Sequence, residues 1–446
     1  NGQPATLFSS YDQQTVNTHF LWMQQNGCDT AALQRFNPNG SEGPTRDAMA
    51  TKVRSAAETY GRKFYIMYDV TGWTNMQSEI KTDWTSKMSA HTASPMYARQ
   101  NGKPVVCIWG FGFNDANHDF TAAACLDVIN WFKSQGCYVI GGVPREWRTG
   151  TGGSRSGFLG TYHAFNMISP WMVGAIGTVT DSDNAYTTYT VPDQADCNAN
   201  GIDYQPCVLP GDVSANQRAH GDFMWRQFYN MCRAGVQGIY ISMFDEYGEG
   251  NQIAKTAETQ ATVPSNSGLL ALDADGTACS SDYYLRLTND GGRMLKGQIA
   301  LTATRPTQPV VGGTTPTVIS LRAAVNNDYV TAENAGASPL IANRTAIGTW
   351  EEFDLINNAD GSISFRAHAN NMYVCADNAG ASPLIANRTA IGAWESFTLI
   401  HNANGTISLQ SHANNMYVTA ENAGASSLIA NRTAIGLWEQ FTLIND

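Results

Sequence analysis

The chain has 446 residues, 43% of them hydrophobic, which is enough for a folded core and indicates about three domains, or one large barrel with a smaller partner. Its 27 basic and 38 acidic residues give a net charge of −11, which argues against nucleic acid and anionic membrane surfaces as partners. No apolar run approaches the roughly 18 residues that a membrane-spanning helix needs.

Short apolar runs alternate with amphipathic stretches over residues 1–301. The runs predicted as strands are residues 5–9, 29–36, 63–70, 103–112, 136–143, 169–177, 203–210 and 238–246. The predicted helices are residues 12–25, 46–60, 121–134 and 216–234. Near-continuous apolar runs separated by helices are typical of parallel strands, and eight of them predict an α/β fold, the (β/α)8 TIM barrel. A doubly wound open sheet is the alternative, although no GxGxxG motif follows the first strand.

The nine cysteines match neither a small disulfide-rich scaffold nor a zinc site. Most lie singly in apolar runs, where a buried thiol is the expected role. Cys197 and Cys207 flank a short loop and could form a disulfide across it.

The chain begins at Asn1 rather than Met, which fits either a removed signal peptide or an engineered start. We expect a secreted protein.

Aromatic and charged side chains follow several of the predicted strands. In a (β/α)8 barrel the active site lies at the carboxyl ends of the strands. Aromatic rings stack on the apolar faces of sugars, and carboxylates bind hydroxyl groups or act as catalysts. The strand-end side chains predicted to bind a sugar are Tyr68, Asp69, Trp73, Trp109, Arg145, Glu146, Trp147 and Trp171. The alternative roles are core packing for the tryptophans and salt-bridged loop positions for the carboxylates.

Three acidic residues, Asp245, Glu246 and Glu249, directly follow the last predicted strand. Repulsion within such a cluster raises the pKa of at least one carboxyl, and a protonated carboxyl beside an ionised one is a general acid/base pair. Gly248 and Gly250 allow a tight turn that would aim both carboxyls at one space. A calcium loop would use similar residues, but the spacing differs from an EF-hand, and we expect neither a metal nor a cofactor.

The stretch SMFDEYGEGNQI resembles the signature of glycoside hydrolase family 99 and its relatives, in which an E-x-x-E pair follows the last barrel strand. Glu246 and Glu249 match the pair, and Gly250, Gln252 and Ile253 match the residues after it. The resemblance to family 71/99-like proteins covers most of residues 1–300. It implies a retaining, endo-acting α-mannosidase or mannanase. In that family's scheme Glu246 would be the base that activates the sugar's own 2-hydroxyl, giving a 1,2-anhydro sugar, and Glu249 would be the acid/base.

This sequence departs from the family's motif at three positions. The family has Asn where this chain has Asp245, and Trp and His where it has Tyr247 and Gly248. Asp245, Tyr247, Asn251 and Gln252 are predicted to line the substrate pocket. The departures leave three alternatives open: another α-glycoside or a furanoside, an α-1,3-glucan as in family 71, and a catalytically silent lectin-like protein. We expect a monomer with a polysaccharide or oligosaccharide as its substrate.

Residues 302–318 are rich in Thr, Pro and Gly and predict a linker between residues 1–301 and a second domain at 319–446. Beyond the linker the sequence repeats every 44 residues, as Trp350, Trp394 and Trp438 show. Three copies rich in β-branched residues predict a β-trefoil, in which each copy supplies about four strands. The repeats resemble fascin-like β-trefoil modules, some of which bind glucans at three sites.

Each repeat places a Glu directly after its Trp. A tryptophan face beside a carboxylate is a minimal sugar site, and three weak sites would bind a polysaccharide through avidity. The predicted pairs are Trp350–Glu351, Trp394–Glu395 and Trp438–Glu439. The alternative for these tryptophans is the hydrophobic core of each repeat. An Asn-Arg pair also recurs in every copy, and it either lines the sugar site or caps a turn; its members are Asn343 and Arg344, Asn387 and Arg388, and Asn431 and Arg432.

Overall fold

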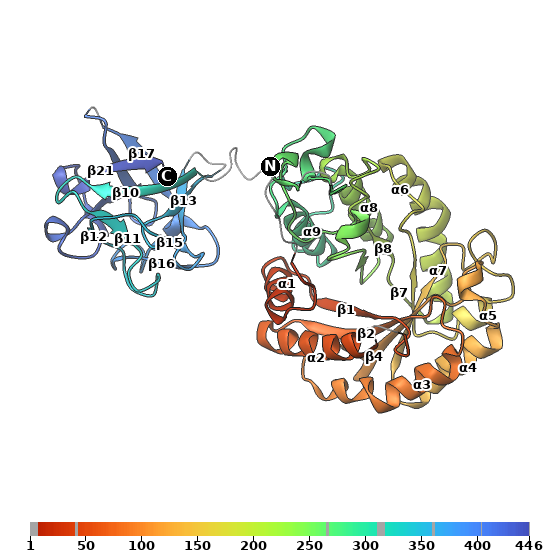
Figure 1. The fold of residues 1–446 in the computed structure, drawn as a ribbon. Helices are drawn as coiled ribbons and strands as arrows, with labels where there is room; N and C mark the ends of the chain where they lie inside the picture. The colour runs from red at the N-terminus through yellow and green to blue at the C-terminus, as the bar shows by residue number, and fades with distance from the viewer. Residues whose placement is uncertain are drawn as a thin grey trace. The chain divides into compact units, whose positions relative to one another are not determined.

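The computed structural model describes residues 8–40, 43–264, 267–309, 317–358, 362–402 and 404–445. The chain divides into two compact units, residues 1–309 and 310–446. Figure 1 colours the first from red to green and the second in cyan and blue. Residues 302–309 pack on the first unit, because Trp225 Nε1 donates to the carbonyl oxygen of Thr302 and Thr307 Oγ1 donates to Asp290. Residues 310–316 of the predicted linker lie outside the described residues.

The first unit is built on parallel strands in chain order (Figure 1). The main sheet runs β1 (Thr30–Arg35), β2 (Lys63–Asp69), β4 (Lys103–Trp109), β5 (Tyr138–Val143), β6 (Met167–Pro170) and β7 (Asp203–Tyr204), and the short β3 (Arg99–Gln100) pairs antiparallel with β4. β8 (Cys207–Val208) and β9 (Tyr240–Ile241) form a separate parallel pair. This arrangement fits the predicted α/β barrel. The predicted strand at residues 5–9 lies largely outside the described residues.

One predicted strand, residues 203–210, changes partners in its middle. Gln205 N donates to the carbonyl oxygen of Ile168, in β6, whereas the carbonyl of Pro206 accepts from Tyr240 N, at the start of β9. Backbone polar groups of consecutive residues point to opposite sides of a strand, so Gln205 bonds β6 on one side and Pro206 bonds β9 on the other. The predicted strand at 169–177 is also displaced. β6 begins at Met167 and ends at Pro170.

Helices connect the successive strands and cover the outside of the sheet (Figure 1). They are α1 (Gln13–Gln25), α2 (Gly43–Tyr60), α3 (Met76–Ser86), α4 (Ala122–Ser134), α5 (Leu159–Tyr162), α6 (Val179–Ala185), α7 (Val191–Asn200), α8 (Asp222–Ala234) and α9 (Tyr283–Leu295). Short helical turns that the site uses are η2 (Ala116–His118) and η5 (Tyr247–Glu249). The helix predicted at 216–234 begins later, at Asp222, because Gly221 has a φ of +90° and interrupts the helix there.

The second unit is a closed barrel of six antiparallel strands, each paired with the next around the ring. Its strands are β10 (Thr317–Ala323), β13 (Phe353–Asn357), β14 (Ile363–Ala367), β17 (Phe397–His401), β18 (Ile407–Ser411) and β21 (Phe441–Asn445), and β21 pairs with β10 to close it. Three hairpins complete the repeats: β11 (Tyr329–Thr331) with β12 (Ile341–Arg344), β15 (Tyr373–Ala376) with β16 (Leu384–Arg388), and β19 (Tyr417–Thr419) with β20 (Ile429–Arg432).

Three backbone hydrogen bonds join the repeats to one another in a ring. Leu340 N donates to Leu384 O, Leu384 N to Leu428 O, and Leu428 N to Leu340 O, each at 2.8 Å. The three leucine side chains are buried in one hydrophobic cluster with Phe353 and Phe397. A single repeat can satisfy neither the ring nor the cluster, so the three copies must fold together.

Candidate active site

The acidic segment after β9 forms a single tight turn. η5 (Tyr247–Glu249) follows Glu246, and Gly250 closes the turn with a φ of +69°. A Cβ atom at Gly250 would lie 3.0 Å from Asp212 Oδ1 and 3.2 Å from the backbone N of Val213, so this position needs glycine for both conformation and space. Glu246 and Glu249 therefore flank one turn of the chain, as the sequence predicted.

Glu246 is the carboxyl of the cluster whose pKa is raised. Burial contributes most, and the charges of Glu249 and Asp245 add to it. Asp245 also lies 3.5 Å from Nδ1 of His19, on α1. Glu246 thus keeps its proton to a higher pH than an ordinary glutamate, and once ionised it is a stronger base than one.

Buried Arg218 holds this turn in place through hydrogen bonds to backbone oxygens. Nη2 of Arg218 donates to the carbonyl oxygens of Gly250 at 2.6 Å and Gln252 at 2.8 Å, and Nε donates to Gly211 O at 3.0 Å. The guanidinium group lies over the ring of Tyr284, 4.4 Å from its centroid. The turn that carries both glutamates is therefore fastened to the α8 side of the barrel.

Asn251 and Gln252 are buried and support the turn, which corrects their predicted place in the pocket lining, whereas Tyr247 is half-buried and its role in the pocket stays a prediction. The side-chain amides of Asn251 and Gln252 contact the carbonyl oxygen of Glu249 and the guanidinium of Arg218. Tyr247 donates its hydroxyl to the carbonyl oxygen of Lys255 at 3.0 Å. Burial raises the pKa of Tyr247, with a further contribution from Asp245.

A hydrogen-bonded network joins the carboxyl ends of β1 and β2 to the loop after β4. Asp69 accepts from Gln34 Nε2 at 2.8 Å and from both the N–H and the hydroxyl of Thr71. The Thr71 hydroxyl lies 3.0 Å from Nε2 of His118, whose Nδ1 lies 2.8 Å from Asp115. Thr71 and His118 were not predicted, since they lie 47 positions apart in two loops and no motif links them.

Trp109 and Trp171 meet beside this network. Their rings are edge to face with centroids 5.3 Å apart, and Trp109 also packs against His118 at 5.5 Å. Gly142 on β5 makes this possible, because a Cβ there would lie 2.3 Å from the Trp109 ring. The structure thus brings together three of the predicted strand-end residues, Asp69, Trp109 and Trp171.

Gln34 and Glu246 line a common cavity of about 740 Å³. Tyr65 and Met67 of β2 and Asp245 also line it. Side chains alternate between the two faces of a strand, so Tyr65, Met67 and Asp69 point to the same face. Gln34 is the member of the strand-end network that lines the cavity, which extends along β1 as far as Cys28 and Asp29.

Tyr68, Trp73 and Trp147 are fully buried, so the prediction that they contact a substrate is wrong. Tyr68 faces the helices, where its hydroxyl donates to Asp83 at 2.8 Å, because it follows the opposite parity to Asp69 on β2. The indole N–H of Trp73 donates to Glu79, and that of Trp147 donates to Asp193. Each of these aromatic residues is part of the core.

Arg145 and Glu146 pair with each other after β5, at 2.5 Å from Nε to Oε1.

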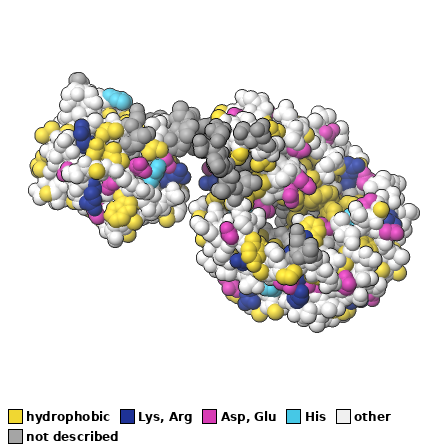
Figure 2. All heavy atoms as spheres, in the orientation of Figure 1, with side chains coloured by type: hydrophobic (Ala, Val, Ile, Leu, Met, Phe, Trp, Pro, Cys, Tyr) yellow, Lys and Arg dark blue, Asp and Glu magenta, His cyan; other side chains and the backbone are white. Residues whose placement is uncertain are grey.

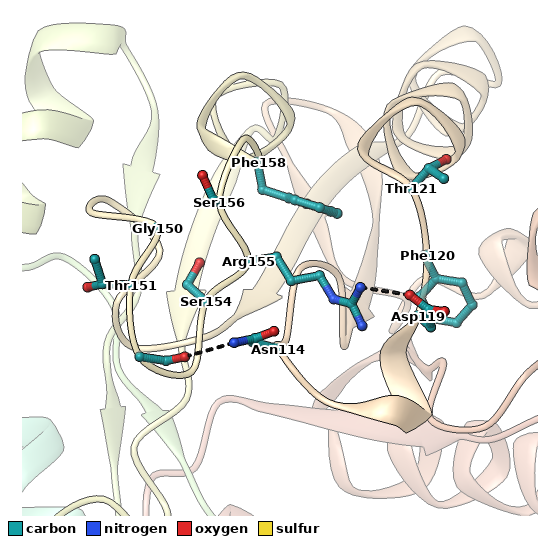
Figure 3. A pocket seen from close by; sticks show the side chains of 11 residues that line it. Asn114, Asp119, Phe120, Thr121, Gly150, Thr151, Ser154, Arg155, Ser156 and Phe158 are labelled. Carbon is teal, nitrogen blue, oxygen red and sulfur yellow. Dashed lines mark hydrogen bonds and ion pairs between the residues drawn. The ribbon is translucent and has the colours of Figure 1, made fainter.

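The nearby loops after β4 and β5 are joined by Arg155, which bonds Asp119 and the carbonyl oxygens of Phe113 and Asp115. Figure 3 shows this arginine beside a surface pocket of about 560 Å³ between the two loops. All three guanidinium nitrogens of Arg155 have partners, so its role is to hold the loops together.

In the second unit the predicted Trp–Glu pairs divide into exposed rings and buried carboxylates. Trp350 and Trp394 are each 36% exposed, and Trp438 is partly buried. Glu351, Glu395 and Glu439 are buried, and each accepts the backbone N–H of the glycine three positions earlier, at 2.7–2.9 Å. Their predicted role in sugar binding is therefore corrected to the capping of a turn.

A different carboxylate stands near each tryptophan. The recurring arginine of every repeat pairs with the acidic residue of the ENAG or DNAG motif; the pairs are Arg344–Glu333, Arg388–Asp377 and Arg432–Glu421. Arg388 and Arg432 also lie over Trp394 and Trp438, at 5.7 and 6.0 Å from the ring centroids. The acidic residues were visible as part of the repeated motif, but nothing in the sequence placed them beside the arginines.

All nine cysteines are free thiols, so Cys197 and Cys207 do not form the bridge that their spacing suggested. Cys197 packs in the main core of the first unit and Cys207 in a separate cluster, and burial raises their pKa values to about 12 and about 11.

Over the described ranges no cluster of three His, Cys, Asp or Glu side chains is arranged to hold a metal ion. Within the same ranges no helix has the length and apolar character to cross a bilayer.

Charged side chains of both signs are dispersed over the face shown in Figure 2. That face carries no extended basic stripe of the kind that tracks a nucleic-acid backbone. The dispersion is consistent with the net charge of −11.

No protein-family model matches the chain, and no curated protein matches it. Among solved structures it is similar to the family 99 endo-α-mannosidase of Bacteroides thetaiotaomicron in complex with bis-tris propane, with a TM-score of 0.50 and 15% identity over 65% of this chain and 86% of that one. A second structure of that enzyme gives 0.49 and 15% over 65% and 82%. A designed three-fold symmetric protein, ThreeFoil, aligns over 29% of this chain and 99% of its own at 20% identity, and its TM-score of 0.27 assigns no fold. At such identities the first similarity shows a shared fold.

Proposed function

We propose that the first unit is a retaining glycoside hydrolase that cleaves an α-linked polysaccharide, with α-mannan as the favoured substrate and endo action. The observation that carries this proposal is the single turn after β9 that bears Glu246 and Glu249, with the pKa of Glu246 raised by burial and by its acidic neighbours. A carboxyl with a raised pKa beside other acidic groups is the kind of arrangement that acid/base glycoside cleavage uses. The fold shared with an endo-α-mannosidase supports the same class of substrate.

In the proposed first step the carboxylate of Glu246 takes the proton of the sugar's 2-hydroxyl. The oxygen O2 then attacks C1, the C1–O glycosidic bond breaks, and the leaving oxygen takes a proton from Glu249, which yields a 1,2-anhydro sugar. In the second step ionised Glu249 takes a proton from water, the water oxygen attacks C1, the C1–O2 bond breaks, and Glu246 returns its proton to O2. Two inversions at C1 give overall retention.

The strand-end network supplies the groups expected to orient the sugar. Gln34 shares the cavity with Glu246, and Trp109 and Trp171 offer aromatic surface at the same end of the barrel. Asp69 is held by Gln34 and Thr71, so its carboxylate is oriented before a sugar arrives. Such pre-orientation reduces the entropy lost on reaching the reactive geometry.

We propose that the second unit is a β-trefoil that binds sugar at three places, and that the protein acts outside the cell as a monomer. The six-strand barrel with three hairpins and an internal repeat supports the trefoil assignment. The half-exposed tryptophans beside charged side chains support sugar binding. Replacing Trp350, Trp394 and Trp438 together by Ala should then abolish polysaccharide binding.

The test of catalysis is product release from α-mannan, α-1,3-glucan and β-1,3/1,6-glucan by wild type, Glu246→Gln and Glu249→Gln. We expect release from one α-linked polymer and its loss in both variants. An unchanged melting temperature of the first unit in the variants controls for folding, because the second unit could bind the polymer by itself. Full activity in either variant contradicts the assignment, and binding without release by the wild type favours a lectin-like protein.

A further inference from the structure

The three repeats of the second unit carry the same polar cluster in two different hydrogen-bonding states. We name these the first cluster (Glu333, Asn343, Arg344), the middle cluster (Asp377, Asn387, Arg388) and the third cluster (Glu421, Asn431, Arg432), beside Trp350, Trp394 and Trp438. In every cluster the arginine Nη1 donates to the side-chain oxygen of the preceding asparagine, at 2.7–2.8 Å. This bond orients the asparagine amide, so its Nδ2 group faces away from the guanidinium.

In the first and third clusters the remaining polar groups satisfy one another. Both carboxylate oxygens of Glu333 lie 2.8–2.9 Å from Arg344 Nη2, and Asn343 Nδ2 donates to the same carboxylate at 3.4 Å. The third cluster repeats this pattern, with Asn431 Nδ2 at 3.2 Å from Glu421. A ligand at the first or the third cluster must displace hydrogen bonds to an ionised carboxylate. Such hydrogen bonds are stronger than those between neutral groups.

The middle cluster leaves one acceptor and one donor unused. Asp377 is one methylene shorter than glutamate, and only its Oδ1 reaches Arg388, at 2.6 Å. Asn387 Oδ1 accepts from Arg388 and also from the thiol of Cys375, at 3.3 Å, where the other repeats have a threonine whose hydroxyl has no partner. Within the described part of the chain, neither Asp377 Oδ2 nor Asn387 Nδ2 forms a hydrogen bond.

The two residues that carry these unused groups are both held by the Arg388 guanidinium through their Oδ1 atoms, and they are accessible to a ligand. The Asp377 side chain is 34% exposed, Asn387 is exposed, and Trp394 is 36% exposed with Arg388 over its ring. A carboxylate oxygen accepts from one hydroxyl and an amide N–H donates to the next, which is the polar complement of a vicinal diol. The indole face offers the apolar surface on which a sugar ring stacks.

We propose that the middle cluster is the primary sugar site of the second unit and that it recognises a vicinal diol of a pyranose through Asp377 and Asn387. The first and third clusters then bind the same sugars more weakly and contribute through avidity on a polymer. This inference rests on the proposed sugar-binding role of the second unit, and it adds that the three sites are unequal.

The test measures sugar binding at each of the three sites separately in the full chain. Tryptophan is replaced by 5-fluorotryptophan, and the 19F resonances of Trp350, Trp394 and Trp438 are assigned from single Trp→Phe variants. The probes are short oligosaccharides from α-mannan, α-1,3-glucan and β-1,3-glucan, titrated one at a time. Two additional hydrogen bonds correspond to about tenfold in affinity, so we expect the Trp394 resonance to respond at about tenfold lower sugar concentration than the other two.

Exchanges between repeats supply the matched variants. Asp377→Glu with Cys375→Thr gives the middle cluster the side chains of its neighbours and should remove its advantage, while Glu333→Asp with Thr331→Cys should strengthen the first site. Equal titration of the three resonances in the wild type, or an order that the exchanges leave unchanged, overturns the proposal. If no resonance responds to any probe, the sugar-binding role of the second unit fails, and the inequality of its sites fails with it.

Discussion

Arg218 Nη2 lies 2.6 Å from the carbonyl oxygen of Gly250, the residue that closes the acidic turn. The guanidinium is buried, and its other hydrogen-bond partners are the carbonyl oxygens of Gly211 and Gln252 and the side chain of Gln252. The arginine therefore ties the C-terminal end of the turn, at Gly250 and Gln252, to the loop that contains Gly211. The positions of Glu246 and Glu249 depend on this buried cation, although neither glutamate is bonded to it in the described structure.

Arg218→Met should lower both stability and turnover. Three carbonyl oxygens lose their donor, at about 1 kcal/mol for each hydrogen bond, and the turn becomes free to move. We expect kcat to fall by at least about tenfold, which corresponds to about 1.4 kcal/mol in the barrier, with a lower melting temperature. Arg226→Met, on α8 and paired with Asp183 at 3.1 Å, is the control for removing an arginine from a nearby part of the chain that does not bond the turn. Unchanged kcat in the Arg218 variant would show that the turn keeps its shape unaided.

Asp245→Asn should move the acidic limb of the kcat/KM profile to lower pH. Burial, Glu249 and Asp245 together raise the pKa of Glu246, so removing the Asp245 charge lowers that pKa. If Glu246 is the base, its ionised form is then available at lower pH. Asp119→Asn, which removes an exposed carboxylate in the loop after β4, serves as the control.

The same profile separates the two roles of Glu246. If Glu246 acts as the proton donor, the Asp245→Asn change moves the basic limb to lower pH instead, and the roles of the two glutamates are exchanged. A profile in which neither limb moves contradicts the participation of Glu246 in proton transfer.

Asp193→Asn should stabilise the first unit at neutral pH. Burial raises the pKa of Asp193 to about 7, although Trp147 and Arg148 bond the carboxylate. Between about pH 4 and pH 7 the unfolded chain releases a proton that the folded chain keeps, so the free energy of unfolding falls by about 1.4 kcal/mol per pH unit. Above pH 7 the loss levels off.

Urea unfolding across this range measures the slope directly. Wild type should lose stability between pH 4 and pH 7, and Asp193→Asn should lose less over the same interval. Below pH 4 the aspartate is protonated in both states, so the two proteins should be similar there, which controls for the change of side chain. Equal slopes in both proteins would contradict a raised pKa at Asp193.

Glu395→Ala should weaken folding but leave sugar binding intact. Its buried carboxylate accepts from Gly392 N at 2.8 Å, and loss of that bond costs about 1 kcal/mol. Asp377→Ala is the matched variant in the same repeat and should have the reverse effect, with weaker binding and little change in stability. Weakened sugar binding in Glu395→Ala alone would restore the carboxylate after the tryptophan as a ligand group.

The order of apolar runs and helices was enough to predict parallel strands, because local hydrophobic periodicity depends on a few neighbouring residues. The apolar runs predicted as strands at residues 63–70 and 103–112 correspond to β2 and β4. The run at 203–210 was the exception, since its change of partners at Pro206 depends on which strands lie beside it. In the second unit the 44-residue repeat predicted three equivalent segments, and the strand pairings follow it.

The acidic turn could also be found in the sequence, because Glu246 and Glu249 are close neighbours along the chain and share one turn. The rest of the site depends on tertiary structure. Tyr68 and Asp69 are adjacent in sequence but point to opposite faces of β2, and only the fold decides which face is the pocket. Composition likewise cannot show that Glu395 caps a turn while Asp377 faces solvent. Local patterns determine which elements form, whereas the direction of each side chain is set by packing between segments far apart in the chain.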